Sequence, residues 1–248
     1  MIKYLFKEIG KRWPFPVCAR TKTGRRMYVD LRSGIGRGIY VVGEFDAAVF
    51  PPISANLAVG STFIDIGANV GYYSMLALDI VGATGQVHAF EIDPRPLKCL
   101  AMTKRQFKLD NFHIHPVALG SSDGHVLLTK DSECGNSHVA ITGNGISVPM
   151  TSLDAWFAMQ NLGRIDVLKI DVEGFELEVL RGGLGVIERF RPHLVIEADD
   201  NMLARNRASV ALIKALLHPY GYAFNEVKDC WSPTLYAVAK RLTRVSSH

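Results

Sequence analysis

The feature that most constrains the fold of this chain is a regular alternation of short apolar runs with segments of helical periodicity. The apolar runs that predict strands occupy residues 62–66, 86–90, 113–119, 166–170 and 193–197. The segments that predict helices occupy residues 70–81, 95–109, 152–160, 175–190 and 204–217. Strands that alternate with helices predict a parallel sheet covered by helices on both faces. Two last runs, 222–227 and 235–239, are joined by a polar turn and predict an antiparallel edge.

This alternation begins at about residue 59 and divides the 248 residues into unequal parts. Residues 1–58 predict an N-terminal amphipathic helix and a small β-containing lead-in, packed on the body, with turns at Gly24 and Gly34. Residues 59–240 predict one α/β domain, interrupted at about 120–150 by a Gly- and Ser-rich, hairpin-like insertion. The polar residues 241–248 predict a flexible tail.

Positive charge is concentrated in the N-terminal segment. Residues 1–40 contain ten Lys or Arg and two acidic residues, whereas the whole chain has a net charge of +4. Between residues 2 and 13, apolar side chains recur at helical spacing with lysines between them. This stripe predicts packing on the body or on a second subunit, as in a homodimer. A peripheral contact of residues 1–16 with an anionic membrane surface stays open, and no nucleic-acid partner is expected.

Composition excludes several classes of protein. With 48% hydrophobic and 21% charged residues the chain is globular. No stretch approaches the roughly 18 apolar residues of a membrane span, and the first residues do not resemble a secretory signal. The four cysteines are far apart and form no CxxC pair, which disfavours a disulfide framework or a zinc knuckle. We therefore expect a cytoplasmic protein, with membrane association at the cytoplasmic face left open.

A glycine turn, DIGANVG at 65–71, lies where the first predicted strand leads into a helix. Open α/β sheets bind ligands at the carboxyl ends of their strands, where a helix N-terminus offers free N–H groups. The spacing of Gly67 and Gly71 differs from the G-x-G-x-x-G pattern of dinucleotide sites. Glu91 ends the second strand, where an acid commonly accepts hydrogen bonds from ribose hydroxyls. Adenosine joined to a compact zwitterion fits this layout, and S-adenosylmethionine has that form.

Five motifs then resemble one known family in order and spacing. They are FIDIGANVGYYS (63–74), HAFEIDP (88–94), VALGSSDG (117–124), SLDAW (152–156) and LKIDVEGFELEVLRGG (168–183). Together they resemble the FkbM-type family of class I S-adenosylmethionine-dependent methyltransferases. The resemblance covers about residues 40–200 and implies a Rossmann-like α/β fold, with a seven-stranded, mostly parallel sheet in the order 3-2-1-4-5-7-6. It also implies methyl transfer to a hydroxyl oxygen of a sugar, glycan or natural-product acceptor.

The cofactor residues follow from these positions. Around the methionine end we expect Asp65, Gly67, Asn69 and Gly71, with Asp171 beside the methyl group. Around the adenosine we expect Glu91 at the ribose, Ile92 and Asp93 beside it, and Ala118 and Leu119 at the adenine. Asp93 has the alternative role of capping the following helix. Ala118 and Leu119 have the alternative role of core residues.

The candidate catalytic groups are mainly carboxylates at the ends of the later strands. An alcohol acceptor needs a base within hydrogen-bond reach of its hydroxyl. Asp171 is the first candidate, Glu173 the second and Glu197 a third, and His138 in the insertion is a candidate base near neutral pH. Asp171 and Glu197 could alternatively share a Mg²⁺ ion, although no sequence signature requires a metal.

Two other functions remain open at this point. An NAD-dependent oxidoreductase could use a similar sheet, and the absent G-x-G-x-x-G pattern argues against it. A non-catalytic cofactor-binding module could dock through its basic N-terminus, and it would bind the cofactor without turnover.

Overall fold

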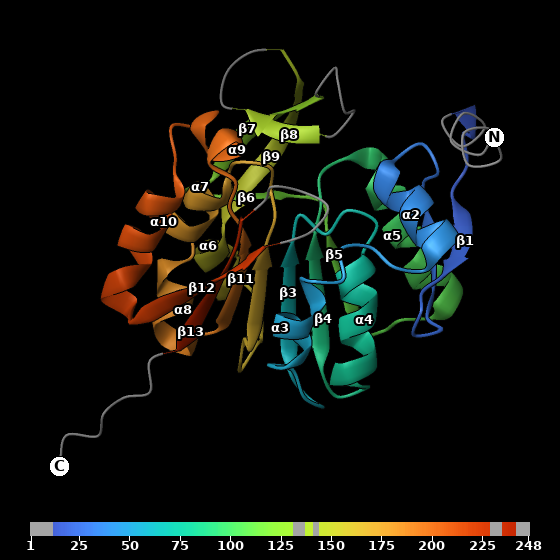
Figure 1. The fold of residues 1–248 in the computed structure, drawn as a ribbon, viewed down its shortest axis with the longest axis horizontal. Coiled ribbons are helices and arrows are strands. Elements are labelled where there is room, and N and C mark those ends of the chain that lie inside the picture. The colour runs from blue at the N-terminus through green and yellow to red at the C-terminus, as the bar shows by residue number, and fades with distance from the viewer. Residues whose placement is uncertain (1–11, 131–136, 141–143, 229–234, 242–248) are drawn as a thin grey trace.

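The computed structural model describes residues 12–130, 137–140, 144–228 and 235–241. A seven-stranded sheet forms its centre, with helices on both sides (Figure 1). In spatial order the strands are β12 (Tyr222–Lys228), β13 (Leu235–Arg241), β11 (His193–Glu197), β10 (Val167–Ile170), β3 (Thr62–Ile66), β4 (Gln86–Phe90) and β5 (Phe112–His115). Numbered along the chain within this sheet and read from β5 to β12, the order is 3-2-1-4-5-7-6, and only the β13 pairings are antiparallel. The expected α/β fold with a mostly parallel sheet is therefore confirmed.

Strand alternation divides the interior into two cores. Successive side chains of a strand point to opposite faces, so Phe63 and Val87 lie in one core while Ile64 and Ile170 lie in the other. Helices α4 (Tyr72–Val81) and α5 (Pro94–Phe107) cover the first face. The second face is covered by α6 (Leu153–Ala158), α7 (Glu176–Arg181), α8 (Leu184–Phe190) and α10 (Val210–Leu217).

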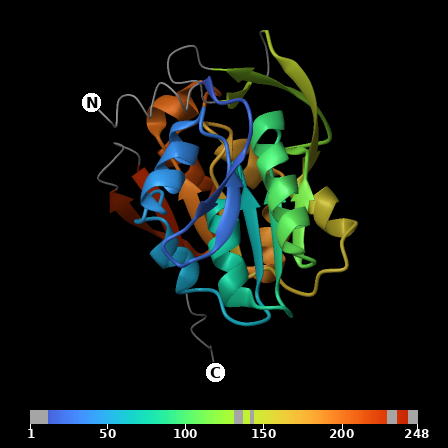
Figure 2. The ribbon, with the colours of Figure 1, turned by 90° about the vertical axis from the view of Figure 1, so that its right-hand side faces the viewer.

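The lead-in shares the first of these cores. It consists of β1 (Val17–Arg20), β2 (Arg26–Val29), α2 (Gly34–Val42) and α3 (Phe50–Ser54). Its buried Met27, Val29 and Ile39 belong to the same cluster as the residues of α4 and α5, and Figure 2 shows α2, α4 and α5 in front of the sheet. Gly24 lies in the β1–β2 turn as expected, but Gly34 is the first residue of α2.

The predicted N-terminal helix and C-terminal tail fall mostly outside the described residues. Residue 12 is the first described residue, and nearby Trp13 and Phe15 are 45% and 62% exposed. No helix among the described residues has the length and apolar character to cross a bilayer. Membrane contact and dimer formation stay predictions.

The predicted third strand, 113–119, is in fact two strands in two sheets. β5 ends at His115, and β6 (Ala118–Gly120) pairs with β9 (Ile146–Ser152) in a second sheet of order β6-β9-β7-β8. Pro116 separates them, because proline has no N–H to continue the ladder. The other strands of this sheet, β7 (Gly124–Lys130) and β8 (Ser137–Ala140), belong to the predicted insertion. Because only two residues separate the start of β6 from the end of β5, the second sheet stands at the carboxyl ends of the parallel strands (Figure 1).

Two predicted helices are each broken in the structure. The helix expected over 175–190 is split into α7 and α8 at Gly182 and Gly183. A Cβ at Gly182 would lie 1.9 Å from the Gly120 carbonyl oxygen, so close packing of β6 requires glycine there. The helix expected over 204–217 is replaced by α9 (Asp200–Ala204), a loop and α10. Ser209 caps the N-terminus of α10, and a short 3₁₀ turn, His218–Tyr220, follows its C-terminus. In both regions the apolar periodicity correctly predicted helical structure. The ends of the helices are set by the Ser209 cap and by the close packing at Gly182.

Candidate active site

Four acidic residues meet at the carboxyl edge of the main sheet. Asp65 lies in β3, Glu91 follows β4, Asp171 follows β10 and Glu197 ends β11. The register places Ile66 beside both Phe90 and Ile170, and Ile170 beside Ile196. The parallel pairing therefore gathers carboxyl groups that are up to 132 residues apart in sequence.

The glycine turn packs directly against the end of β10. Gly67 has φ +76°, and a Cβ there would lie 1.7 Å from the Asp171 carbonyl oxygen. The Asp171 N–H in turn donates to the Ile66 carbonyl oxygen at 3.0 Å. Gly67 is thus required by contact between two strand ends, whatever ligand the turn binds. Gly71, with φ +84°, begins α4 as its N-cap.

Glu91 is held by three backbone N–H groups. Its carboxylate accepts hydrogen bonds from Asn69 at 2.8 Å, Ile92 at 2.7 Å and Asp93 at 2.8 Å. Burial raises the pKa of Glu91 to about 6, although these three bonds oppose the shift. Asn69 stands in the left-handed region with φ +50°, and its side chain accepts from the Val70 N–H. The predicted ribose acid is therefore joined to the glycine turn through the backbone.

Asp65 lies beneath the edge and has no exposed surface. Its Oδ2 accepts a 2.6 Å hydrogen bond from the Ser74 hydroxyl of α4, and its Oδ1 lies 3.6 Å from the Lys169 ammonium. Burial raises its pKa, while Lys169 and Ser74 act in the opposite direction. In this structure its charge faces Lys169, so direct contact with a cofactor ammonium would require the edge to open.

Lys169 is a site residue that the sequence reasoning did not single out. It lies in the middle of β10, with its side chain only 4% exposed, and donates to Asp171 Oδ2 at 2.9 Å. The available signal was a lysine inside an otherwise apolar run, DVLKI. A buried lysine needs a partner, and the parallel register supplies one by placing Lys169 beside Asp65.

Asp171 and Glu197 share a hydrogen bond between their carboxyl groups. Burial, the Asp171 charge and this bond raise the pKa of Glu197 to about 11. Burial would also raise the pKa of Asp171, but the Lys169 charge and the bonds from Glu197 and Lys169 lower it. These effects drive the two pKa values apart, so at neutral pH the pair holds one proton and one negative charge. The Asp171 side chain is 27% exposed, so it brings the pair to the surface of the edge.

A metal site was the alternative for this pair. Within the described part of the chain, no group of three or more His, Cys, Asp or Glu side chains is arranged to hold a metal ion. Asp171 and Glu197 are joined in this structure by the hydrogen bond between their carboxyl groups.

The turn after β10 is held in a strained shape by a second residue that sequence reasoning missed. Glu173 has φ +56°, in the left-handed region, and is only partly exposed. Below it, the Glu176 carboxylate accepts from the N–H groups of Val172 at 3.0 Å and Gly174 at 3.1 Å. Glu176 is 2% exposed, and burial raises its pKa to about 7. Acidic residues are common at helix starts, where the helix dipole stabilises them. The position of Glu176 in the sequence therefore did not indicate that it holds the turn.

The remaining predicted residues lie around the edge. Asp93 caps α5, as its Oδ1 accepts from the Arg95 N–H at 2.9 Å. Ile92 packs on a small cluster formed by Ala118 and Phe175. Ala118 and Leu119 are buried in β6 rather than at the end of the third strand. His138 lies in β8 opposite Thr129, and its side chain falls outside the described part of the chain.

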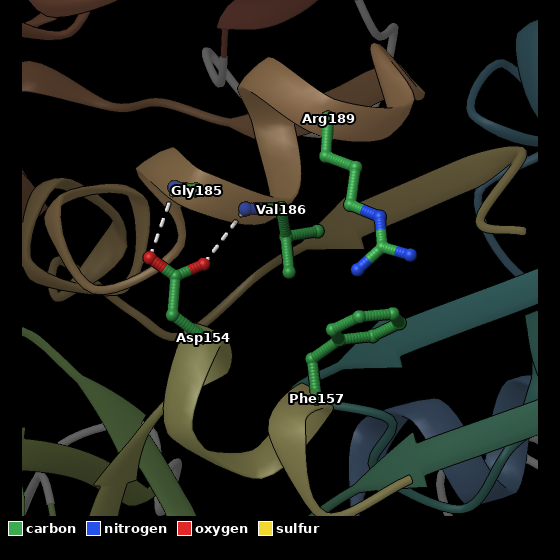
Figure 3. A pocket seen from close by; sticks show the side chains of 5 residues that line it. All are labelled: Asp154, Phe157, Gly185, Val186 and Arg189. Atoms are coloured by element: carbon green, nitrogen blue, oxygen red, sulfur yellow. Dashed lines mark hydrogen bonds between the residues drawn. The ribbon is translucent and has the colours of Figure 1, made fainter. Parts of the chain in front are cut away.

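A hollow between α6 and α8 has a different character. Its lining includes Asp154, Phe157 and Arg189, with the Arg189 guanidinium 5.4 Å from the Phe157 ring centre (Figure 3). Asp154 accepts hydrogen bonds from the N–H groups of Gly185 and Val186, which begin α8. These contacts join two helices on a face of the sheet and are explained by packing.

Comparison with known proteins shows which family the chain belongs to. The model of the methyltransferase FkbM domain matches residues 65–224, which include every carboxylate of the edge. The chain belongs to the FkbM methyltransferase family. It is therefore an S-adenosylmethionine-dependent methyltransferase, as the sequence motifs implied.

Individual relatives of this FkbM methyltransferase are distant. Methyltransferase 1 of Beauveria bassiana (strain ARSEF 2860) is 25% identical over 222 residues, covering 80% of this chain and 84% of that protein. The crystal structure of methyltransferase FkbM from Methylobacillus flagellatus KT has a TM-score of 0.51 at 19% identity. That alignment covers 72% of this chain and 44% of the other, so this chain spans less than half of that protein's length.

A putative rRNA-methylase structure from Clostridium thermocellum has a TM-score of 0.50 at 9% identity, covering 78% of this chain and 93% of that one. These two structural likenesses show a common fold and say nothing about the acceptor.

Proposed function

We propose that this FkbM methyltransferase transfers the methyl group to a hydroxyl oxygen of a sugar, glycan or related natural-product acceptor, with Asp171 as the base. The observation that carries the proposal is the Asp171 carboxylate. It is partly exposed at the edge of the sheet and is bonded to Lys169 and Glu197, and the Lys169 charge lowers its pKa. A base must lie within hydrogen-bond reach of the proton that it removes, and this carboxylate is directed by two partners before an acceptor arrives.

The residues of the other half of the edge suit S-adenosylmethionine, which supplies an electrophilic methyl group on a sulfonium. A carboxylate has about four acceptor sites, and Glu91 uses three of them for backbone N–H groups. The remaining site can accept a ribose hydroxyl. Helix α4 begins directly after the glycine turn, so its free N–H groups can bind the carboxylate of the methionine end.

The choice of an oxygen acceptor rests on the resemblance to the family, and the proton balance of the pair fits it. Transfer to a hydroxyl forms a C–O bond, breaks the S–C bond, and releases the hydroxyl proton, and the sulfonium loses its positive charge. The Asp171–Glu197 pair begins with one negative charge and one proton. Taking up the released proton neutralises the pair as the sulfonium becomes neutral, so the edge does not accumulate charge. Glu173, in the adjacent strained turn, is proposed to orient the acceptor.

The first test is calorimetric titration with S-adenosylhomocysteine and, separately, with NAD. We expect micromolar binding of S-adenosylhomocysteine and no comparable binding of NAD. Glu91→Ala should weaken that binding at least tenfold, or about 1.4 kcal/mol. Preference for NAD, or unchanged binding in the variant, would contradict the assignment of the cofactor half.

The second test addresses the acceptor half. Acceptor hydroxyl compounds are screened with a labelled methyl donor, first with the wild type and then with Asp171→Asn. The amide keeps the shape of Asp171 but cannot take the proton, so we expect turnover to fall about 10²–10⁴-fold. The binding of S-adenosylhomocysteine should be retained. Binding without turnover on any acceptor would instead favour a non-catalytic cofactor-binding module.

A further inference from the structure

Lys169 is the residue that connects the two halves of the edge. It is a cation in the middle of the central strand β10, with Asp65 on neighbouring β3 and Val195 on β11 beside it. Its side chain is 4% exposed, so water cannot solvate the ammonium. Such a group persists only when charged and polar neighbours replace the water.

Its neighbours come from every element packed around it. The ammonium lies 2.9 Å from Asp171 Oδ2 and 3.6 Å from Asp65 Oδ1. On the α4 side it stands 5.2 Å from the centre of the Tyr73 ring, which gives a favourable cation–π contact. Glu197 of β11 also raises the pKa of Lys169 when Glu197 is ionised, whereas burial alone would lower it. The balance of these effects raises the pKa of Lys169, so it is charged throughout the neutral range.

The two carboxylates that face Lys169 differ in what else holds them. Asp65 has the Ser74 hydroxyl and no exposure. Asp171 shares a hydrogen bond with Glu197, and the Glu173 charge also raises the pKa of Glu197. The Asp171 charge in turn raises the pKa of Glu176. Two carboxyl groups in contact cannot both ionise, and a cation beside one of them decides which one keeps the charge.

We propose that Lys169 is a positioning residue: by its contact with Asp171 it fixes the direction of that carboxylate and makes Asp171, rather than Glu197, the ionised member of the pair. This inference rests on the proposed function only for its catalytic consequence, because the ionisation itself can be measured without an acceptor. The same ammonium faces Asp65 beneath the glycine turn, so it also ties the cofactor half to the acceptor half.

The test uses Lys169→Met, which keeps the length of the side chain and removes the charge, with Lys169→Arg as the matched charge-retaining variant. The carboxyl carbons of Asp and Glu are labelled with ¹³C and titrated by NMR in the presence of S-adenosylhomocysteine. Spectra of Asp171→Asn and Glu197→Gln assign the two signals. In Lys169→Met we expect the Asp171 titration to move upward by about one to three pH units, whereas Lys169→Arg should stay near the wild type.

Removing only the lysine leaves Asp65 buried without its cation, and that change can destabilise the protein. The double variant Asp65→Asn/Lys169→Met removes both charges and is titrated in the same way. We expect it to melt at a higher temperature than Lys169→Met and to show the same upward movement of Asp171. A purely structural lysine would predict restored stability with an unmoved Asp171 titration, and that result would overturn the proposal.

Calorimetry with S-adenosylhomocysteine on the same samples separates the two levels of inference. If the wild type failed to bind it, the proposed function would fail, while the titrations would still decide the role of Lys169. If binding is normal and Asp171 titrates alike in the wild type and in Lys169→Met, only the role of Lys169 is wrong.

Discussion

The two halves of the carboxyl edge hold their acids in different ways. In the β3–β4 half, Glu91 is bound by three backbone N–H groups. In the β10–β11 half, Asp171 is bound by the side chains of Lys169 and Glu197. Backbone amides do not titrate and cannot rotate away, so the fold alone fixes the cofactor acid. The base depends on the charge of its neighbours, so single substitutions there should change chemistry before they change structure.

The largest effect is expected where the two halves touch. Gly67→Ala would put a Cβ 1.7 Å from the Asp171 carbonyl oxygen and would also strain a backbone at φ +76°. Since the ends of β3 and β10 must separate to relieve this contact, we expect a loss of about 4 kcal/mol or more in stability. Urea unfolding measures this loss of stability, and the variant should also lose the binding of S-adenosylhomocysteine.

Gly24→Ala is the matched control, because Gly24 has φ +91° but nothing within 4 Å of the added Cβ. It isolates the cost of left-handed backbone, about 1–2 kcal/mol. Equal losses in the two variants would mean that strand contact at Gly67 is unimportant.

A smaller loss of stability is expected at Glu176. This acid lies in the β10–β11 half but, like Glu91, it is bound by backbone N–H groups. Glu176→Ala leaves the buried N–H groups of Val172 and Gly174 without their acceptor, so we expect about 2 kcal/mol of destabilisation at pH 8. Glu176→Gln keeps an acceptor oxygen and should lose less than half as much. Chemical denaturation compares the variants.

The pH dependence of this pair of variants checks the same point. The folded-state pKa of Glu176 is about 7, above its ordinary value of 4.5, so the folded protein binds the proton more tightly. Wild-type stability relative to Glu176→Gln should therefore rise as the pH falls from about 8 toward 5. A flat difference across this range would show that Glu176 is not buried as described.

The sequence predicted the parts of the fold that depend on local pattern. Strands β3, β4, β10 and β11 are short, mostly apolar runs, and their order follows from the family. It did not predict that the chain joins a second sheet after Pro116. Proline interrupts the hydrogen bonds of a strand but does not determine which strand the following residues pair with. The break at Gly182 depends on a carbonyl oxygen 62 residues away, in Gly120, which no local pattern contains.

The site was predictable to the same extent. Acids at strand ends are visible in sequence, and Asp65, Glu91, Asp171 and Glu197 do meet at one edge. Which groups these acids contact depends on how the strands pair, and the sequence alone does not show this. The contact of Lys169 with Asp65 forms only because β10 pairs with β3. Glu176 accepts its hydrogen bond from Gly174 only because the start of its helix packs against the preceding turn.

The next effect tests the pH dependence of ligand binding in the cofactor half, where Glu91 is the titrating group. Burial raises the pKa of Glu91 to about 6, and the three N–H groups favour its ionised form. Affinity for S-adenosylhomocysteine should therefore be constant above pH 7 and weaken by about three- to tenfold between pH 7 and pH 5. Calorimetry across this range measures it. Glu91→Gln should bind more weakly and without this pH dependence, and an identical pH dependence in the variant would assign it to another group.

The smallest effect gives a reference value for a backbone-held acid away from the edge. Asp154 accepts from the Gly185 and Val186 N–H groups at the start of α8, on a face of the sheet and away from its carboxyl edge. Asp154→Ala should cost about 1 kcal/mol of stability, the usual value of a helix cap, and leave S-adenosylhomocysteine affinity unchanged. Asp154→Asn should recover most of that loss. If Glu91→Ala loses a similar amount of stability but also loses affinity, the difference between the two sites is ligand binding. If Asp154→Ala weakens affinity too, the variants report on general loosening of the domain, and the contrast between the two halves of the edge has to be measured by local probes.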